Sequence, residues 1–267
     1  TGMDNHPMWD DVRFNPATNT QEQADVGLNA LHAADALCLS HMAALLGDTK
    51  QSAAYRDASA QKAGLIESQL WNDADGLWLC RDWNGTWNHR ASSCCFYPMV
   101  LPQADAAHVR RAIADHLLNP RRFGGKYLLP VTPRDDPAYP EQYYTRGRIW
   151  PGQAVLVHWA LREQGQEDAA AELARGCLAT AHDEWLNEGH LHENYHAETA
   201  DGDDTPESGT IYSYGMMLPL IAWNHLRDQC IDGREVTAPP ETFADFLDRD
   251  GTLLHKIDPR ETLPPLE

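Results

Sequence analysis

The stretch QEQADVGLNALHAADALCLSHMAALL, residues 21–46, decides the fold class. Its apolar residues recur at every third or fourth position, which is the period of one face of an α-helix. They are Ala24, Leu28, Leu31, Ala34, Leu37, Cys38, Met42 and Leu45. Gly47-Asp48 follows directly and is typical of a helix end. The pattern predicts a long amphipathic helix.

Five further stretches with helical spacing follow along the chain. They cover residues 51–70, 106–118, 152–163, 167–185 and 211–227. Asp105 is placed to cap the helix that begins at residue 106, and Pro151 suits the first turn of the next one. The last stretch is mostly apolar, so we expect it to be buried. The sequence therefore predicts an all-α protein whose helices are joined by long loops.

The stretch WNDADGLWLCRDWNGTWNHR, residues 71–90, interrupts the helices. Asp75-Gly76 and Asn84-Gly85 are turn signals flanked by Trp, Leu and Thr. Asp73 and Asp75 could also suggest calcium, but the distant Glu of a helix–loop–helix calcium site is missing. We therefore predict a short β-hairpin over one end of the helices.

The first eleven residues, TGMDNHPMWDD, hold three carboxylates, one Trp and one His. Gly2 and Pro7 keep this segment out of a regular helix. An indole can stack on the apolar face of a sugar, while carboxylates take its hydroxyls or its glycosidic oxygen. On spacing alone, an acidic turn that leads into the first helix explains the segment about equally well.

A second acidic segment, HLHENYHAETADG, lies far downstream at residues 190–202. It also places acids beside an aromatic residue in a turn-rich stretch. Glycoside hydrolysis needs two carboxyl groups that flank one bond, and the inverting reaction needs one protonated and one ionised. Asp4 and Glu193 can form such a pair although they are far apart in the sequence.

Three segments resemble motifs of glycoside hydrolase family 63, a relative of the trehalases, and they occur in the family's order. TGMDNHPMWD resembles S/T-G-L/M-D-N-S-P-x-W-D, YYTRGRIWP resembles Y-W-R-G-x-x-W-P, and ENYHAETADG resembles E-x-Y-x-P-x-T-G-x-G. That family includes processing α-glucosidases and mannosylglycerate hydrolases. The resemblance implies an inverting hydrolase of an α-glucoside or α-mannoside that needs no cofactor.

The family pattern also implies roles for single residues. Asp4 matches the general acid and Glu193 matches the general base. Candidate substrate-binding residues are Asn5, Trp9, Asp10, Tyr144, Arg146, Trp150 and Tyr195. The two Trp residues would stack on sugar rings, with core packing as the alternative. Arg146 would hold a hydroxyl or an anionic aglycone, with a salt bridge to a nearby acid as the alternative.

The sequence also departs from the family pattern. His6 stands where the family usually has Ser, Met8 where many members have Arg, and Thr145 where the second motif has Trp. Ala197 and Ala200 replace Pro and Gly in the third motif. Because His6 and Met8 border the acid, the substrate cannot be copied from any one family member.

The resemblance implies an (α/α)6 toroid, in which an inner and an outer ring of helices enclose a pocket at one end. Such a toroid has six helical pairs, whereas the sequence predicts only about six helices. We therefore expect a toroid that is incomplete at its N-terminus and only marginally stable alone. A preceding segment or an oligomer would complete it. Residues 1–230 would form the catalytic portion, and residues 231–267 a tail on the same domain, with a hairpin around Asp250-Gly251.

Bulk properties narrow the possible partners. The net charge of −19 argues against nucleic acid, and no run of about 18 apolar residues predicts a membrane helix. We expect a soluble, cytoplasmic protein that binds a carbohydrate. The six cysteines lack zinc or disulfide-framework spacing, and Cys38 and Cys177 are predicted core thiols. The spacing of His190, His192 and His196 does not suit one helical face, so no metal is expected.

Two other functions stay open at this stage. The chain could be a carbohydrate-binding remnant that keeps the acids but has lost catalysis, which binding without turnover would reveal. It could also be an α/α-barrel sugar epimerase that uses His192 and His196. Release of reducing sugar separates hydrolysis from epimerisation.

Overall fold

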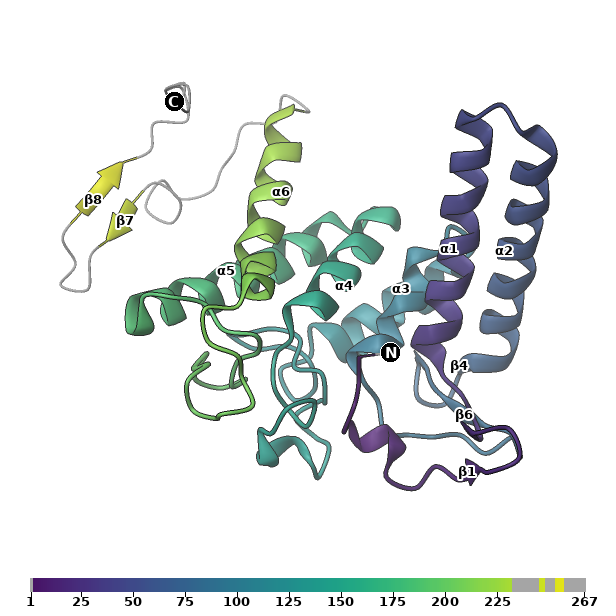
Figure 1. Cartoon of the computed structure of the whole chain (residues 1–267), viewed down its shortest axis with the longest axis horizontal. Coiled ribbons are helices and arrows are strands. Elements are labelled where there is room, and N and C mark those ends of the chain that lie inside the picture. The colour runs from purple at the N-terminus through teal and green to yellow at the C-terminus, as the bar shows by residue number, and fades with distance from the viewer. Residues whose placement is uncertain (1, 232–244, 248–252, 257–267) are drawn as a thin grey trace.

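The computed structural model describes residues 2–231, 245–247 and 253–256, and most of them belong to helices or to the loops between them (Figure 1). The α-helices of this part of the chain are α1 (Val26–Leu45), α2 (Thr49–Leu70), α3 (Ala106–Ala112), α4 (Pro151–Glu163), α5 (Glu167–Glu188) and α6 (Met217–Ile231). Short helical turns are η1 (Pro7–Trp9), η2 (Ser93–Val100), η3 (Ile113–Leu117), η4 (Tyr139–Glu141) and η5 (Ser213–Met216). Every predicted helix is present.

The strands are short and pair as two-stranded antiparallel ladders. The pairs are β1 (Phe14–Asn15) with β2 (Thr20–Gln21), β3 (Gln23–Ala24) with β6 (Arg81–Asp82), β4 (Trp71–Asn72) with β5 (Leu77–Trp78), and β7 (Asp245–Leu247) with β8 (Leu253–Lys256). The predicted hairpin is confirmed by the β4–β5 ladder, with Asp75-Gly76 at its turn, and by a bridge between Arg81 and Trp87 around Asn84-Gly85.

Side-chain caps set where the helices begin. Asp25 accepts from the backbone N–H of Leu28 at 2.8 Å, so α1 begins at Val26 rather than at residue 21. Residues 23 and 24 instead pair with β6. Asp105 caps α3 by accepting from the N–H of Ala107 at 2.7 Å, and Pro151 is the first residue of α4, as predicted.

The helices pack as hairpins around the buried η2 segment. Helices α1 and α2 form one antiparallel hairpin, α4 contacts η2 and α5, and α5 contacts α6. The long loops gather on one side of the helices, at the bottom of Figure 1. This arrangement brings the loops that carry the three motifs to the same side of the molecule.

Two expectations about buried faces are wrong. The stripe predicted for α1 leaves Leu28, Cys38, Met42 and Leu45 exposed, because α1 instead packs through small residues such as Ala30 and Ala33. Helix α6 is only partly buried: one side is in the core, whereas Leu220 and Trp223 are exposed. Cys177 is buried, as predicted.

Most of the predicted tail, including Asp250-Gly251, lies outside the described residues. Strands β7 and β8 pair on either side of that predicted turn. Among the helices that the structure describes, none combines the length and the apolar character needed to cross a membrane.

Candidate active site

The acid loop, residues 2–11, is held against the fold by its own buried side chains. The Nδ1 atom of His6 accepts from the N–H of Met8 at 3.0 Å, so its Nε2 atom carries the proton and donates to the carbonyl of Val131 at 3.1 Å. Burial lowers the pKa of His6 to about 4, which keeps the ring neutral near pH 7. The indole of Trp9 donates to the carbonyl of Met3 at 2.7 Å. Both departures at His6 and Met8 are therefore buried supports of the loop.

The loop is also clamped to the second motif. The Oδ1 atom of Asn5 accepts from the backbone N–H of Thr145 at 2.9 Å and from its hydroxyl at 2.6 Å. Arg146 donates to both carboxylate oxygens of Asp10, at 2.9 and 3.1 Å, and to both of Glu141, at 2.6 and 3.0 Å. A fifth bond reaches the carbonyl of Asn5 at 3.1 Å. All five N–H groups of Arg146 thus have protein acceptors.

A tight turn in the second motif presents Tyr144. Tyr143 and Arg146 exchange backbone hydrogen bonds of 3.2 and 2.9 Å, and Tyr144 between them has a φ of +51°, which is uncommon for a residue with a side chain. The indole of Trp150 donates to the Tyr144 carbonyl at 2.9 Å. The two rings meet edge to face, with centroids 4.8 Å apart. Tyr144 and Trp150 therefore form one rigid aromatic corner before α4.

The third motif is joined to the second by a backbone bridge. Ile149 and Tyr195 exchange N–H···O bonds of 2.8 and 3.0 Å. The ring of Tyr195 is fully buried, and this burial raises the pKa of its hydroxyl. The hydroxyl donates to the carbonyl of His192 at 2.9 Å. Glu193 lies between His192 and Tyr195 in the sequence, and its backbone N–H donates to the carbonyl of Gly209 at 3.0 Å.

Arg148 supports the same loop and was missed by the sequence analysis. It is fully buried, it contacts Asn194, and it makes an ion pair with Asp204 at 2.8 Å. Its Nη2 atom also donates to the carbonyl of Asp201 at 3.2 Å. The available signal was a charged residue directly before the apolar pair Ile149-Trp150.

A pocket of about 260 Å³ lies where these segments meet. It is lined by Gly2, Asp4, Leu31, Tyr97, Tyr144, Trp150, Gly152, Gln153, Leu156 and Tyr214. Tyr214, another residue that the sequence analysis missed, lies with its ring 6.3 Å from Trp150. Its hydroxyl approaches Gly152 so closely that a Cβ at this position would lie 1.8 Å from it. The pocket thus offers an acid and an aromatic wall.

The charge of Glu193, which does not itself line the pocket, reaches two of its tyrosines. Burial raises the pKa of Tyr144, and the negative charges of Glu193 and Asp4 raise it further. Burial also raises the pKa of Tyr214, and Glu193 adds to that shift. Both carboxylates are therefore close enough to act on the Tyr144 hydroxyl.

The two acids also share a lack of protein partners. Within the described residues, no hydrogen bond or ion pair of the Asp4 or Glu193 carboxylate is found. Three further acids near these loops, Asp10, Glu141 and Asp204, are by contrast paired with Arg146 or Arg148. Asp4 is exposed and Glu193 is half-buried, so both can meet a ligand.

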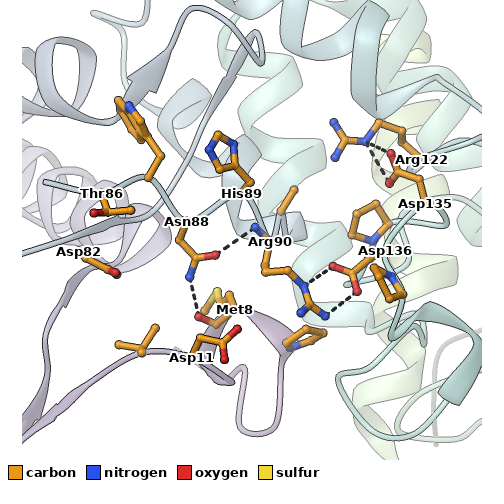
Figure 2. Close-up of a pocket in the computed structure, with 16 residues that line it drawn as sticks. Met8, Asp11, Asp82, Thr86, Asn88, His89, Arg90, Arg122, Asp135 and Asp136 are labelled. Atoms are coloured by element: carbon orange, nitrogen blue, oxygen red, sulfur yellow. Dashed lines mark hydrogen bonds and ion pairs between the residues drawn. The ribbon is translucent and has the colours of Figure 1, made fainter.

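A second pocket, of about 460 Å³, lies at the far end of the acid loop (Figure 2). There Arg90 donates to both oxygens of Asp136 at 2.7 and 2.8 Å, and Arg122 pairs with Asp135 at 3.1 Å. Asn88 donates to the carbonyl of Met8 at 2.7 Å. Because its arginines are already paired with acids, we place the candidate active site in the smaller pocket at Asp4.

The predicted site residues divide by position. Asp4, Tyr144 and Trp150 line the pocket, and Glu193 acts on it electrostatically. The others hold the loops around it: Asn5, Trp9, Asp10, Arg146 and Tyr195. Their direct contact with a sugar stays a prediction.

Comparisons with known proteins show the family and the fold of the chain. The profile of the mannosylglycerate hydrolase MGH1-like glycoside hydrolase domain matches residues 1–214. No curated protein matches the chain. A GH63 mannosylglycerate hydrolase from Thermus thermophilus in complex with glucose has a similar structure, with a TM-score of 0.66 and 20% identity over 84% of this chain and 62% of that one.

Two more solved structures share the fold. An uncharacterised conserved protein from Thermus thermophilus has a TM-score of 0.67 and 22% identity over 84% of this chain and 62% of its own. The neutral trehalase of Saccharomyces cerevisiae has a TM-score of 0.58 and 14% identity over 83% of this chain and 41% of its own. The predicted fold, that of the (α/α)6 toroid enzymes, is confirmed, and the chain spans less than two thirds of the length of these structures.

Proposed function

The chain belongs to the mannosylglycerate hydrolase MGH1-like glycoside hydrolase family, and from that premise we propose that it contributes the catalytic pair of an inverting glycosidase. The bond cleaved would be α-glycosidic, in a glucoside or a mannoside. One observation carries the proposal: Asp4 lines a pocket with an aromatic wall, and among the described residues neither the Asp4 nor the Glu193 carboxylate has a hydrogen-bond or ion-pair partner.

In this proposal Asp4 is the general acid. It would give its proton to the glycosidic oxygen as the bond to the anomeric carbon breaks. Glu193 is the general base and would take a proton from a water that attacks the opposite face of that carbon. The products are a free sugar of inverted configuration and the alcohol of the aglycone, and the two carboxyl groups exchange their protonation states.

The aromatic residues would bind the sugar ring. Tyr144, Trp150 and Tyr214 line the pocket, and their aromatic rings together with the two tyrosine hydroxyls suit a ligand with one apolar face and a rim of hydroxyls. We assign Asn5, Asp10 and Arg146 to positioning, because their hydrogen bonds fix the acid loop to the second motif.

The experiment that tests the proposal compares Asp4→Asn and Glu193→Gln with the wild type on nitrophenyl α-mannosides and α-glucosides and on mannosylglycerate. Loss of general acid or base assistance lowers a rate by roughly 10²–10⁴-fold, so we expect kcat to fall at least that far. Asp11→Asn is the matched control, because Asp11 is an exposed acid in the same loop that lines the other pocket.

Each outcome separates the rival functions. Wild-type turnover in a folded Asp4→Asn or Glu193→Gln protein would refute the assignment. Sugar binding by the wild type without any release of sugar would favour a carbohydrate-binding remnant. The epimerase alternative is weakened because His192 is fully buried against Glu184 and does not line the pocket.

A further inference from the structure

A buried acid–histidine contact lies beneath the loop that carries Glu193. Glu184, in the last turns of α5, is 1% exposed, and the Nδ1 atom of His192, which is 0% exposed, lies against its Oε1 atom. Neither residue lines the candidate pocket. Burial of ionisable groups costs free energy unless they are paired, so this contact needs an explanation beyond packing.

Glu184 holds two separate parts of the loop. Its carboxylate oxygens accept from the backbone N–H of Gly202 at 3.1 and 3.2 Å, while its Oε1 atom also meets His192. The His192 ring packs directly on Gly202, where a Cβ would lie 2.4 Å from the ring. The loop segments around residues 192 and 202 therefore close on one carboxylate of α5.

The backbone of His192 carries this anchor to the next residues. Its N–H donates to the Tyr195 hydroxyl at 3.1 Å, and that hydroxyl donates to its carbonyl at 2.9 Å. Glu193 is the first residue after His192, inside the turn that these bonds close. A shift of the His192 ring would therefore move the Glu193 backbone directly.

We propose that Glu184 and His192 form one positioning pair that fixes the loop and thereby sets the place of the Glu193 carboxylate. This inference rests on the proposed function, in which Glu193 is the general base. Neither residue touches the substrate, and both act through the loop backbone.

The pair also links the loop to pH. Burial raises the pKa of Glu184 to about 7, and the charges of Asp201, Glu188 and Asp203 add to the shift, while the N–H of Gly202 opposes it. Burial lowers the pKa of His192, helped by His190 and opposed by Asp203 and Glu188. Because burial disfavours the ionised carboxylate, the anchor is most stable below about pH 7 and weakens as the pH rises through that value.

The test compares Glu184→Gln with Glu188→Gln, which removes the same charge one turn later on α5. We expect Glu184→Gln to lower kcat by roughly 100-fold, the cost of a misplaced catalytic group, with little change in KM. We also expect it to remove the part of the pH dependence of kcat near pH 7 that comes from Glu184. Glu188→Gln should retain kcat and a pH dependence of kcat, which moves to slightly lower pH because the charge of Glu188 raises the pKa of Glu184. Equal pH profiles and equal kcat in the two variants would overturn the inference.

A second variant covers the case in which Glu184→Gln does not fold. His192→Asn keeps a donor that can face Glu184. We therefore expect a smaller loss of kcat, and we expect the pH dependence of kcat near pH 7 to be retained. If His192→Asn lost the pH dependence of kcat near pH 7, that dependence could not be assigned to Glu184.

Hydrogen exchange separates this inference from the proposed function. In Glu184→Gln the Gly202 and Glu193 amides should exchange faster than in Glu188→Gln, whether or not the protein has activity. An inactive wild type with this exchange difference would refute the proposed function only. Unchanged exchange would refute the positioning pair.

Discussion

The side chain of Asn5 and the residue Thr145 are joined by two hydrogen bonds to a single oxygen. Asn5 Oδ1 accepts from the Thr145 backbone N–H at 2.9 Å and from its hydroxyl at 2.6 Å. Asn5 directly follows the proposed acid, and Thr145 directly follows the pocket residue Tyr144. This one contact therefore ties the proposed proton donor to the aromatic wall.

Thr145→Val tests how much the acid depends on this contact. Val keeps the shape and the backbone bond but removes the hydroxyl bond, so we expect a loss of roughly 0.5–1.5 kcal/mol in the free energy of unfolding. If Asn5 positions Asp4, kcat falls more than KM rises. Chemical denaturation and steady-state kinetics measure the two effects.

Thr49→Val is the control for this change. Thr49 is exposed at the start of α2, and the described residues offer its hydroxyl no hydrogen bond. Its substitution should leave kcat unchanged. An equal response of the two variants would mean that the Asn5 contact does not act on catalysis.

Hydrolysis should invert the anomeric centre. The reason is the proposed pair of a general acid and a general base, which lets water attack directly. Proton NMR of the sugar formed first, before mutarotation, should show the β-anomer from an α-linked substrate. Initial release of the α-anomer would instead indicate a covalent intermediate and a different role for Glu193.

The motifs could be found in the sequence because their residue types are set by local chemistry. Asp4 and Trp150 line one pocket as expected, although the loops that carry them are joined by the long-range contact between Asn5 and Thr145. The roles within the motifs were harder to predict. Arg is a residue type that often binds ligands, so the sequence indicated such a role for Arg146. The folded loops show instead that its five donors face Asp10, Glu141 and Asn5.

The packing face of α1 shows the limit of periodicity. Leu28, Met42 and Leu45 have helical spacing, yet the helix approaches its neighbours through alanines and Gly27. A Cβ on Gly27 would lie 2.7 Å from the Cβ of Cys94, so the close contact with η2 favours small residues. The spacing of apolar residues predicts that a helix forms. Which of those residues are buried depends on how closely the neighbouring element packs against the helix.

Gly152→Ala should displace the Tyr214 hydroxyl from the pocket. The added Cβ would lie 1.8 Å from that oxygen, and such overpacking costs roughly 1–3 kcal/mol. The double variant Gly152→Ala/Tyr214→Phe lacks the oxygen at 1.8 Å but keeps the ring carbon Cζ at 2.7 Å, so it should recover only part of that loss. Unfolding free energies of the single and double variants measure the coupling.

Gly64→Ala provides the matched control on α2. Nothing lies within 4 Å of its added Cβ, and Ala favours a helix over Gly by roughly 1 kcal/mol, so this change should stabilise the protein. A stabilising effect of Gly152→Ala would show that Tyr214 is free to move.

Acid should destabilise the protein in part through His6. Its pKa is lowered to about 4 in the fold by burial, against about 6.5 in an unfolded chain. Between these values the unfolded chain binds more protons, so stability is complete above pH 6.5 and falls as the pH approaches 4. From pH 7.5 to 5 the loss of unfolding free energy assigned to His6 is roughly 2 kcal/mol.

In His6→Asn, whose amide oxygen can still accept from the N–H of Met8, this part of the pH dependence of stability should vanish. The measurement is urea unfolding at both pH values, with His182→Asn, an exposed histidine on α5, as the control. An unchanged slope in His6→Asn would show that another group causes the acid sensitivity.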